Sequence, residues 1–148
     1  PDVGNAKRAR IYAQRLGGEL AIIDKQRITG AKAVAGAIIG DVRNKTVLMI
    51  DDMILTAGTM SEAARVVRDQ GATRVLVGAT HAVLSGPAVE RLSGDYIDEV
   101  AVTDTIPIDD DKRARLGGKL TVLSVAELLG EAIRRIHYNQ SISILFSR

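Results

Sequence analysis

The sequence predicts a single α/β domain in which helices flank a parallel sheet. Short apolar runs of strand length alternate with segments of helical periodicity along most of the chain. The strand candidates are near-continuous apolar runs, which is typical of parallel strands buried on both faces by helices. The 148 residues suit one domain, and no internal repeat or low-complexity linker divides them. We therefore expect one domain over residues 1–148.

The amino-acid composition excludes several classes of protein function. Apolar residues make up 46% and charged residues 26% of the chain, which is the ordinary globular range. A net charge of +2, with basic residues scattered along the chain, gives no argument for nucleic-acid binding. The absence of cysteine excludes a disulfide framework, a thiolate metal site and a cysteine nucleophile. No apolar run reaches membrane-spanning length and no signal-peptide pattern begins the chain, so we expect a cytoplasmic protein with no membrane partner.

The first half of the chain contains two helical patterns separated by apolar runs. The spacing of apolar residues predicts a helix over residues 4–16, which Gly17 and Gly18 end. Strands are predicted over residues 19–24, 37–42 and 46–50, and a second helix over residues 61–70. Residues 25–35 lose this periodicity and mix charge with Gly and Ala, which predicts a long, mobile loop.

The second half continues the alternation. Strands are predicted over residues 74–80, 99–103 and 120–123. Helices are predicted over residues 87–92, where Pro87 takes a first helical position, and over residues 125–137. Residues 81–86 and 106–118 are expected to be loops, and residues 141–147 an extended or irregular tail. Helical spacing places Leu128, Leu129, Ile133 and Ile136 on a core-facing stripe.

Residues 46–59 (TVLMIDDMILTAGT) combine features of an anion site. A buried strand is followed by two carboxylates, a small-residue loop and the second helix. Ligands of open parallel sheets bind beyond the carboxyl ends of the strands, and the free N–H groups at a helix start attract anions. Gly58 lets the backbone approach a ligand closely, and Thr56 and Thr59 add hydroxyl donors.

Asp51 and Asp52 add hydrogen-bond acceptors next to this predicted anion site. Two adjacent carboxylates suit a pair of vicinal hydroxyls or a hydrated Mg²⁺ ion. A sugar phosphate carries both parts, an anion at one end and hydroxyls at the other. The sequence therefore predicts a sugar-phosphate site, and the alternative is a strand end followed by an ordinary turn.

Several stretches in order resemble the ribose-phosphate pyrophosphokinase family, also called PRPP synthetase. These stretches are PDVG with the following basic residues (1–10), AIIDKQR (21–27), VLMIDDMILTAGT (47–59), THAVLSGPA (80–88), TDTIP (103–107), LLGEAIRRIH (128–137) and SISILF (141–146). The resemblance runs nearly end to end, but only to the second half of that family's chain.

The resemblance implies transfer of the β,γ-pyrophosphoryl group of ATP to the 1-hydroxyl of ribose 5-phosphate, giving PRPP and AMP, with Mg²⁺ as cofactor. It implies a type I phosphoribosyltransferase-like fold and a larger homo-oligomer, which in the family is a hexamer. The first half of the family chain, the N-terminal half, would be the partner that supplies most of the adenine pocket. We expect this chain alone to bind ribose 5-phosphate or PRPP weakly without making the product.

The resemblance also implies roles for particular residues. Lys25 and Arg27 would be the catalytic basic pair, and Asp2 would serve the metal. Asp51 and Asp52 would take the ribose hydroxyls. The backbone of Leu55, Thr56, Ala57, Gly58 and Thr59 would hold the 5-phosphate. A regulatory phosphate or nucleotide-diphosphate site between subunits would be lined by Ser141, Ile142, Ser143, Ile144, Leu145 and Phe146.

The chemistry of Lys25 and Arg27 agrees with this role. Phosphoryl-type transfer needs positioning and charge stabilisation more than covalent help from the protein. Two cations two residues apart on an extended segment point to the same side, so both can converge on one pyrophosphoryl group. A mobile loop that closes over ATP also excludes water. The alternative is a solvated basic loop.

Two positions depart from the family pattern. Leu55 stands where the family usually has Asp, and Asn5 stands where it commonly has Gly. A phosphate cradle built from backbone survives the change at Leu55, so we expect weakened or altered activity with binding retained. Two further functions stay open: a non-catalytic regulatory subunit, which Leu55 favours, and a phosphoribosyltransferase, which lacks the basic loop and the SISILF tail.

Overall fold

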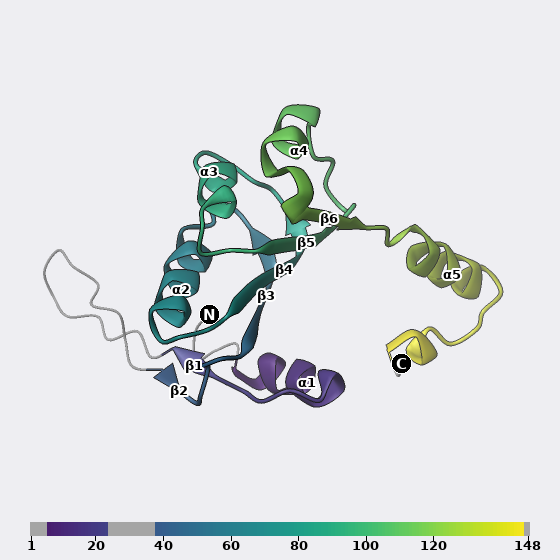
Figure 1. Ribbon diagram of the computed structural model, residues 1–148. Helices are drawn as coiled ribbons and strands as arrows, with labels where there is room; N and C mark the ends of the chain where they lie inside the picture. Colours follow the sequence, from purple (N-terminus) through teal and green to yellow (C-terminus); the bar gives the residue numbers. More distant parts are fainter. Residues whose placement is uncertain (1–5, 24–37, 147–148) are drawn as a thin grey trace, which may run out of the picture.

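The computed structural model describes residues 6–23 and 38–146, and it has the expected α/β class (Figure 1). A four-stranded parallel sheet forms its centre, with strand order β3-β4-β5-β6. The elements in chain order are α1 (Ala6–Leu16), β1 (Ile22–Ile23), β2 (Ile38–Ile39), β3 (Thr46–Ile54), α2 (Gly58–Asp69), β4 (Arg74–Ala82), α3 (Ala88–Ser93), β5 (Glu99–Thr103), α4 (Asp110–Leu116), η2 (Gly117–Lys119), β6 (Leu120–Leu123), α5 (Ala126–His137) and η3 (Ser143–Phe146).

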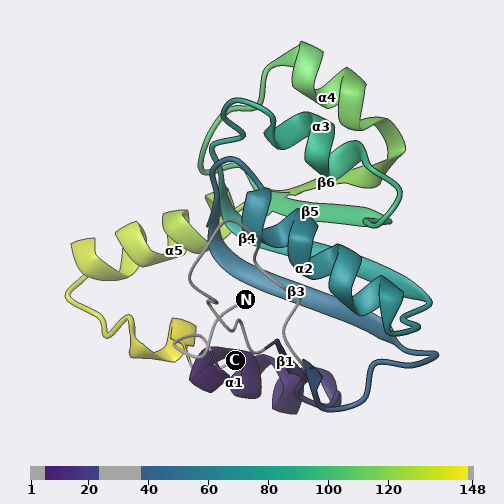
Figure 2. The ribbon, with the colours of Figure 1, turned by 90° about the vertical axis from the view of Figure 1, so that its left-hand side faces the viewer.

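Three crossover helices cover one face of this sheet. Neighbouring strands follow each other in sequence, and right-handed crossovers then place every connecting helix on the same side. Figures 1 and 2 show α2, α3 and α4 together on that side. The expected burial of both faces is therefore wrong for the described residues. On the opposite face, Leu48 and Leu123 remain 43% and 54% exposed.

The core lies between this sheet and the covering helices. Val75, Val77, Val100 and Val102 point from β4 and β5 into it and are almost completely buried. From the helix side, α2 contributes small or branched residues that allow close packing. These are Ala63, Ala64, Val66 and Val67. Burying one such aliphatic side chain is worth roughly 1.5–3 kcal/mol, so this aliphatic layer holds the sheet and helices together.

Two predicted strands differ from the structure. Over residues 19–24 and 37–42 only Ile22–Ile23 and Ile38–Ile39 are strands, and they pair antiparallel in a separate two-stranded sheet. Figures 1 and 2 show this pair beside α1, near the β3 edge of the main sheet. Both apolar runs do contain strand residues, but each run contributes only two residues to the antiparallel pairing.

The predicted loop over residues 106–118 is also wrong in part, because α4 occupies its centre. Asp109 has extended backbone angles before the helix, and Asp110 and Asp111 lie in the first turn, where carboxylates interact well with the helix dipole. Lys112 forms an ion pair with Asp109 at 3.0 Å. The acidic run is therefore a helix start rather than a solvated loop.

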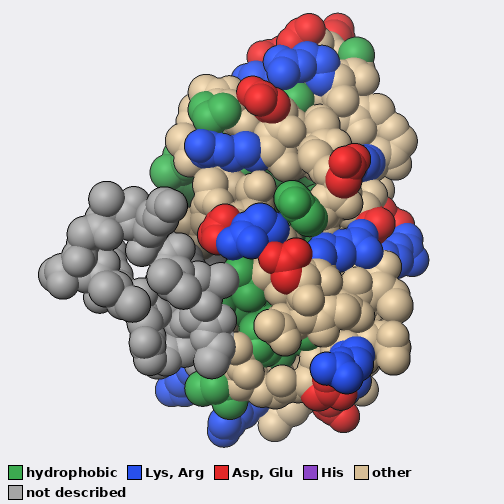
Figure 3. Space-filling model, turned by 60° about the vertical axis from the view of Figure 1, so that its left-hand side comes forward, with side chains coloured by type: hydrophobic (Ala, Val, Ile, Leu, Met, Phe, Trp, Pro, Cys, Tyr) green, Lys and Arg blue, Asp and Glu red, His purple; other side chains and the backbone are tan. Residues whose placement is uncertain are grey.

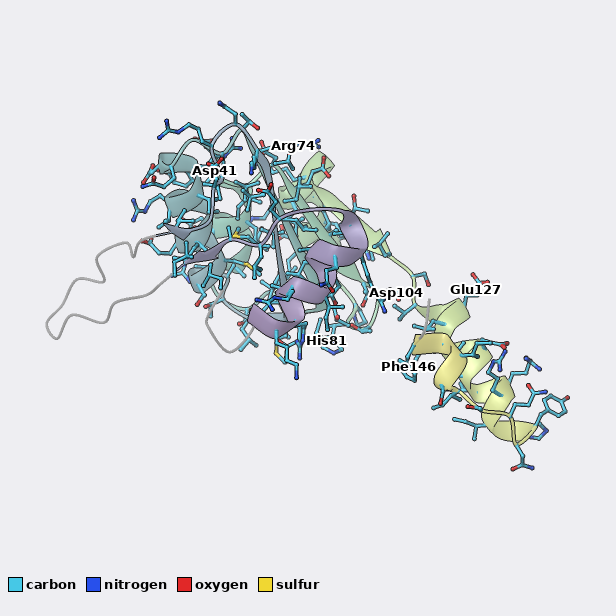
Figure 4. All side chains as sticks on the ribbon, turned by 90° about the horizontal axis from the view of Figure 1, so that it is seen from below. Asp41, Arg74, His81, Asp104, Glu127 and Phe146 are labelled. Atoms are coloured by element: carbon cyan, nitrogen blue, oxygen red, sulfur yellow. The ribbon has the colours of Figure 1, made fainter. Side chains whose placement is uncertain are left out.

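The last helix leaves the body of the molecule. Figures 1 and 4 show α5 and η3 projecting from the end of β6, away from α2. The four residues expected to face the core, Leu128, Leu129, Ile133 and Ile136, are between 52% and 68% exposed, so that prediction is wrong for the described residues. Because α5 follows the edge strand β6, it extends beyond the sheet, where the described residues provide no surface for its apolar side chains. In the tail expected to be extended or irregular, residues 141 and 142 are irregular, while Ser143–Phe146 form the 3₁₀ helix η3.

The surface of the helix-covered side carries charges of both signs. Figure 3 shows acidic and basic side chains next to one another across it. Ion pairs such as those of Arg65 with Glu62 and Asp69, at 2.6 and 2.8 Å, account for part of this pattern. Among the helices of the described residues, none combines the length and apolar character that crossing a membrane requires.

Candidate functional site

The paired carboxylates lie inside β3 rather than after it. This strand continues to Ile54, and Met53 still pairs with His81 of β4. Asp51 and Asp52 are therefore part of the end of β3, and not the acidic tip after the strand that the sequence predicted. Asp51 Oδ1 accepts a hydrogen bond of 2.9 Å from the backbone N–H of Asp52. Both side chains reach solvent at the carboxyl end of the sheet.

The loop behind these carboxylates is shorter than expected. Leu55, Thr56 and Ala57 connect β3 to α2, while Gly58 and Thr59 already belong to the first turn of the helix. Ala57 is buried and takes left-handed backbone angles, φ 56° and ψ 13°. No side chain caps the start of α2, and no carboxylate lies in its first turn. The N–H groups at this helix start and the partial positive charge of the dipole therefore suit an anion.

The loop after β4 fixes the position of this connection. The backbone N–H of Leu84 donates to the carbonyl of Ile54 at 3.0 Å, and that of Ser85 donates to the carbonyl of Leu55 at 2.9 Å. Leu84 is buried and itself has a positive φ of 50°. Residues from two neighbouring strand ends thus form one structure at the edge where parallel sheets bind ligands.

A third element reaches the same loop through Arg91 of α3. Its Nη1 donates a 2.9 Å hydrogen bond to the carbonyl of Thr56. Arg91 lies 35 residues further along the chain, and no spacing pattern connects it with the loop. Sequence reasoning gave this residue no role.

A group of hydroxyls and one histidine lies at the ends of β4 and β5. His81 Nδ1 is 2.9 Å from Thr105 Oγ1, and the hydroxyls of Thr103 and Thr105 both donate to the carbonyl of Thr80. Figure 4 shows His81 and Asp104 at the opposite end of the molecule's body from Asp41 and Arg74. The polar groups of these side chains therefore hydrogen-bond to one another and to the Thr80 carbonyl at the carboxyl end of the sheet.

Asp104 accepts hydrogen bonds from the residues that precede α5. The Ser124 hydroxyl and the Val125 N–H hydrogen-bond its carboxylate and hold the pKa of Asp104 below its usual value. The distance from Val125 N to Asp104 Oδ1 is 2.9 Å. This carboxylate therefore connects β5 to α5.

The described residues contain no cluster of three or more His, Cys, Asp or Glu side chains that would hold a metal by themselves. Asp51 and Asp52 can still supply one or two oxygens, which is how proteins usually hold Mg²⁺ together with substrate phosphates. Asp2, Lys25 and Arg27, expected to serve the metal and the catalytic loop, lie outside the described residues, as does Asn5.

The expected regulatory residues 141–146 do not meet the loop. They follow α5, and Arg135 of that helix donates to the carbonyl of Ser141 at 3.1 Å. Glu131 accepts hydrogen bonds from Arg134 and Arg135, and the Arg134 bond contributes most to lowering the pKa of Glu131 to about 2. Part of α5 and residues 144–145 line a cavity of about 420 Å³. Its charged lining consists of two arginines, Arg134 and Arg135, and two glutamates, Glu127 and Glu131.

A larger cavity of about 510 Å³ lies between α1, the segment after it and β3. Its lining includes residues 46–50 of β3 but none of residues 51–59. It is therefore separate from the loop.

Comparison with known proteins places the chain among similar sequences and structures. The family described as the phosphoribosyl synthetase-associated domain matches residues 25–147. A ribose-phosphate pyrophosphokinase of Synechocystis sp. is 52% identical over 99% of the chain and 43% of the relative, and one of Rhodopirellula baltica is 51% identical over 99% and 46%. The crystal structure of phosphoribosylpyrophosphate synthetase from Mycobacterium smegmatis superposes with a TM-score of 0.84 at 43% identity, covering 94% of the chain and 44% of that protein.

The chain thus spans less than half the length of these relatives. The comparisons do not support the expected assignment to the second half of the family chain. They support the expected α/β fold, since the superposed structure has it over nearly the whole of this chain.

Proposed function

Because this chain belongs to the phosphoribosyl synthetase-associated domain family, we propose that it supplies the ribose 5-phosphate site of a PRPP-forming enzyme in the cytoplasm. The reaction transfers pyrophosphate from ATP to the 1-hydroxyl of ribose 5-phosphate. The remaining length of the family chain supplies the rest of the ATP site. Residues 1–148 act as one domain of this larger enzyme, and the domain is inactive alone.

The observation that carries this proposal is the uncapped start of α2 behind a three-residue loop. The backbone of Leu55, Thr56, Ala57, Gly58 and Thr59 would surround the 5-phosphate there. Backbone N–H groups and the helix dipole favour a doubly charged phosphate without a dedicated basic side chain. The buried Ala57 gives this turn a fixed shape, which suits recognition of one anion geometry.

The carboxylates would recognise the sugar. One oxygen of Asp51 already accepts the Asp52 N–H, while the exposed Asp52 presents its carboxylate to solvent at the same sheet edge. Carboxylate oxygens accept hydrogen bonds from vicinal hydroxyls and keep the ribose ring in register with its phosphate. This division of tasks supports a phosphorylated pentose rather than a free sugar or a free phosphate.

Lys25 and Arg27 would stabilise the transferring pyrophosphoryl group, with Arg27 offering a planar fork and Lys25 a point charge. Bound Mg²⁺ would neutralise phosphate charge, with Asp2 serving the metal. The family resemblance also supports a homo-oligomer and a regulatory anion site lined by residues 141–146. Arg134 and Arg135 line the cavity next to these residues, together with Glu127 and Glu131.

Calorimetric titration with ribose 5-phosphate tests the proposal on this chain. We expect weak, saturable binding, with ribose and inorganic phosphate each binding more weakly because each engages only half of the site. The Asp52→Asn variant, which keeps the size of the side chain, should lose affinity for the sugar phosphate but not for inorganic phosphate. Absence of heat at millimolar ribose 5-phosphate, with circular dichroism showing a folded sample, would refute the proposed site.

One observation favours a second function. Leu55 replaces the acidic residue usual in the family and is 51% exposed beside the loop. A non-catalytic regulatory subunit would keep the anion site and lose the carboxylate that orients metal, water or sugar. Such a subunit would bind ribose 5-phosphate but add no turnover to the assembled protein.

A further inference from the structure

Arg91 lies against the loop that the proposed function places around the 5-phosphate. Its Nη1 donates to the carbonyl of Thr56 at 2.9 Å. A Cβ added to Gly58 would stand 3.1 Å from the same Nη1 and 3.7 Å from Cζ. The guanidinium therefore occupies the space that a side chain at Gly58 would need, and glycine at this position allows the approach.

The hydrogen bond fixes the orientation of one peptide group. Across a trans peptide, the carbonyl of Thr56 and the N–H of Ala57 point in opposite directions. Holding that carbonyl towards α3 turns the N–H of Ala57 to the other side of the loop. Ala57 has left-handed backbone angles, which are strained for a residue with a Cβ and persist only where neighbouring contacts hold them.

The guanidinium of Arg91 forms no ion pair with a carboxylate of the described residues. Within the described part of the chain, Arg65, Arg68, Arg74, Arg134 and Arg135 form ion pairs with carboxylates at short range. No such ion pair involves Arg91 there, and the side-chain hydrogen bond that it makes goes to the neutral carbonyl of Thr56. Its positive charge therefore remains next to a loop that already favours an anion.

We infer that Arg91 is a positioning residue of the proposed ribose 5-phosphate site. It holds the peptide between Thr56 and Ala57 so that the Ala57 N–H is available to the phosphate, and it adds positive charge behind the loop. The inference rests on the proposed function, because the loop must bind a phosphate for this orientation to matter. The phosphate contacts themselves remain with the loop backbone.

Calorimetry with ribose 5-phosphate on Arg91→Ala, Arg91→Lys and the unchanged chain tests the inference. Loss of a hydrogen bond to a charged donor predicts that Arg91→Ala weakens affinity about tenfold or more. Arg91→Lys restores the charge and one donor, so it should recover part of the loss. Guanidinium added well below denaturing concentrations should restore affinity to Arg91→Ala, which a merely structural defect would not allow. Gly58→Ala, which crowds the same guanidinium, should weaken binding in the same direction.

Arg115→Ala is the matched control, because it removes one arginine from the neighbouring helix α4 without touching the loop. Its affinity should equal that of the unchanged chain. If the unchanged chain binds ribose 5-phosphate and Arg91→Ala binds it equally well, the inference is overturned while the proposed function stands. A loss that neither lysine nor guanidinium repairs also overturns it. If the unchanged chain does not bind, the proposed function itself fails.

Discussion

Leu55 is a large apolar side chain at a place where the core does not need one. Its neighbours Ile54 and Ala57 are buried, but Leu55 is half exposed, and only its backbone carbonyl is held, by Ser85. A polar side chain therefore fits at this position without cost to packing. The departure from the family pattern bears on chemistry rather than on folding.

Replacing Leu55 with Asp should raise turnover of the full-length protein in a PRPP-forming assay. The carboxylate would restore an acidic group beside the proposed sugar-phosphate site. Affinity for ribose 5-phosphate should change little, because in the proposed site the loop backbone holds the phosphate. Leu55→Asn is the matched control, since it has the size and polarity of Asp without its charge. No gain with Asp, or an equal gain with Asn, would contradict this explanation.

Among single residues, the sequence pointed to the contiguous part of the proposed site, which stays a prediction, and gave no sign of Arg91. Residues 51–59 follow each other along the chain, so strand length, charge and small residues were enough to identify them. Arg91 reaches Thr56 across 35 residues, and no local pattern reports such a contact. The sequence also could not show that β3 continues through both carboxylates, because Asp51 and Asp52 have low strand propensity and the ladder with β4 overrides it.

Among the elements, Arg68 and Asp98 connect α2 to the sheet. The carboxylate of Asp98 accepts a 2.6 Å hydrogen bond from the N–H of Val75 at the start of β4 and pairs with the guanidinium of Arg68. Arg68 also donates to the carbonyl of Thr73 at 2.7 Å. These contacts fix one end of the helix whose other end forms the proposed phosphate site.

This network predicts a pH dependence. Burial alone would raise the pKa of Asp98, but the hydrogen bonds from Val75 and Arg68 outweigh it and hold the pKa below the ordinary value of 3.8. A carboxylate whose pKa is lowered by folding stabilises the fold at pH values above its unfolded-state pKa. This contribution is lost as the pH falls below 3.8 and through the pKa of the folded state. Asp98→Asn should therefore lower the free energy of unfolding at neutral pH by about 1–3 kcal/mol, and the difference should shrink in acid.

Urea denaturation at a series of pH values measures this difference. Asp95→Asn is the control, because Asp95 is an exposed carboxylate in the same connection between α3 and β5. A destabilisation by Asp98→Asn that stays constant from neutral pH to below the ordinary pKa would show that the charge of Asp98 is not what stabilises the fold.

Most helices and sheet strands were predictable because their apolar periodicity is local. The exceptions have physical reasons. The acidic residues before α4 resemble a solvated loop unless their place at a helix N-terminus is known. The two short segments β1 and β2 depend on pairing with each other, which sequence alone does not reveal.

For the whole molecule, the order of strands could not be read from the sequence, although the parallel α/β class could. The strand order β3-β4-β5-β6 places three helices on one face, while α5 carries its apolar stripe away from the sheet. A 12-residue helix whose apolar stripe has no packing surface among residues 6–23 and 38–146 is marginal in water.

The most direct test of the central claim is a ¹⁵N–¹H NMR titration of the chain with ribose 5-phosphate. If the start of α2 holds the phosphate, the backbone amides of Ala57, Gly58 and Thr59 should shift together and saturate. The amides of Gly117 and Gly118, in η2, should not shift. Shifts confined to other elements, or none in a folded sample at saturating ligand, would contradict the claim.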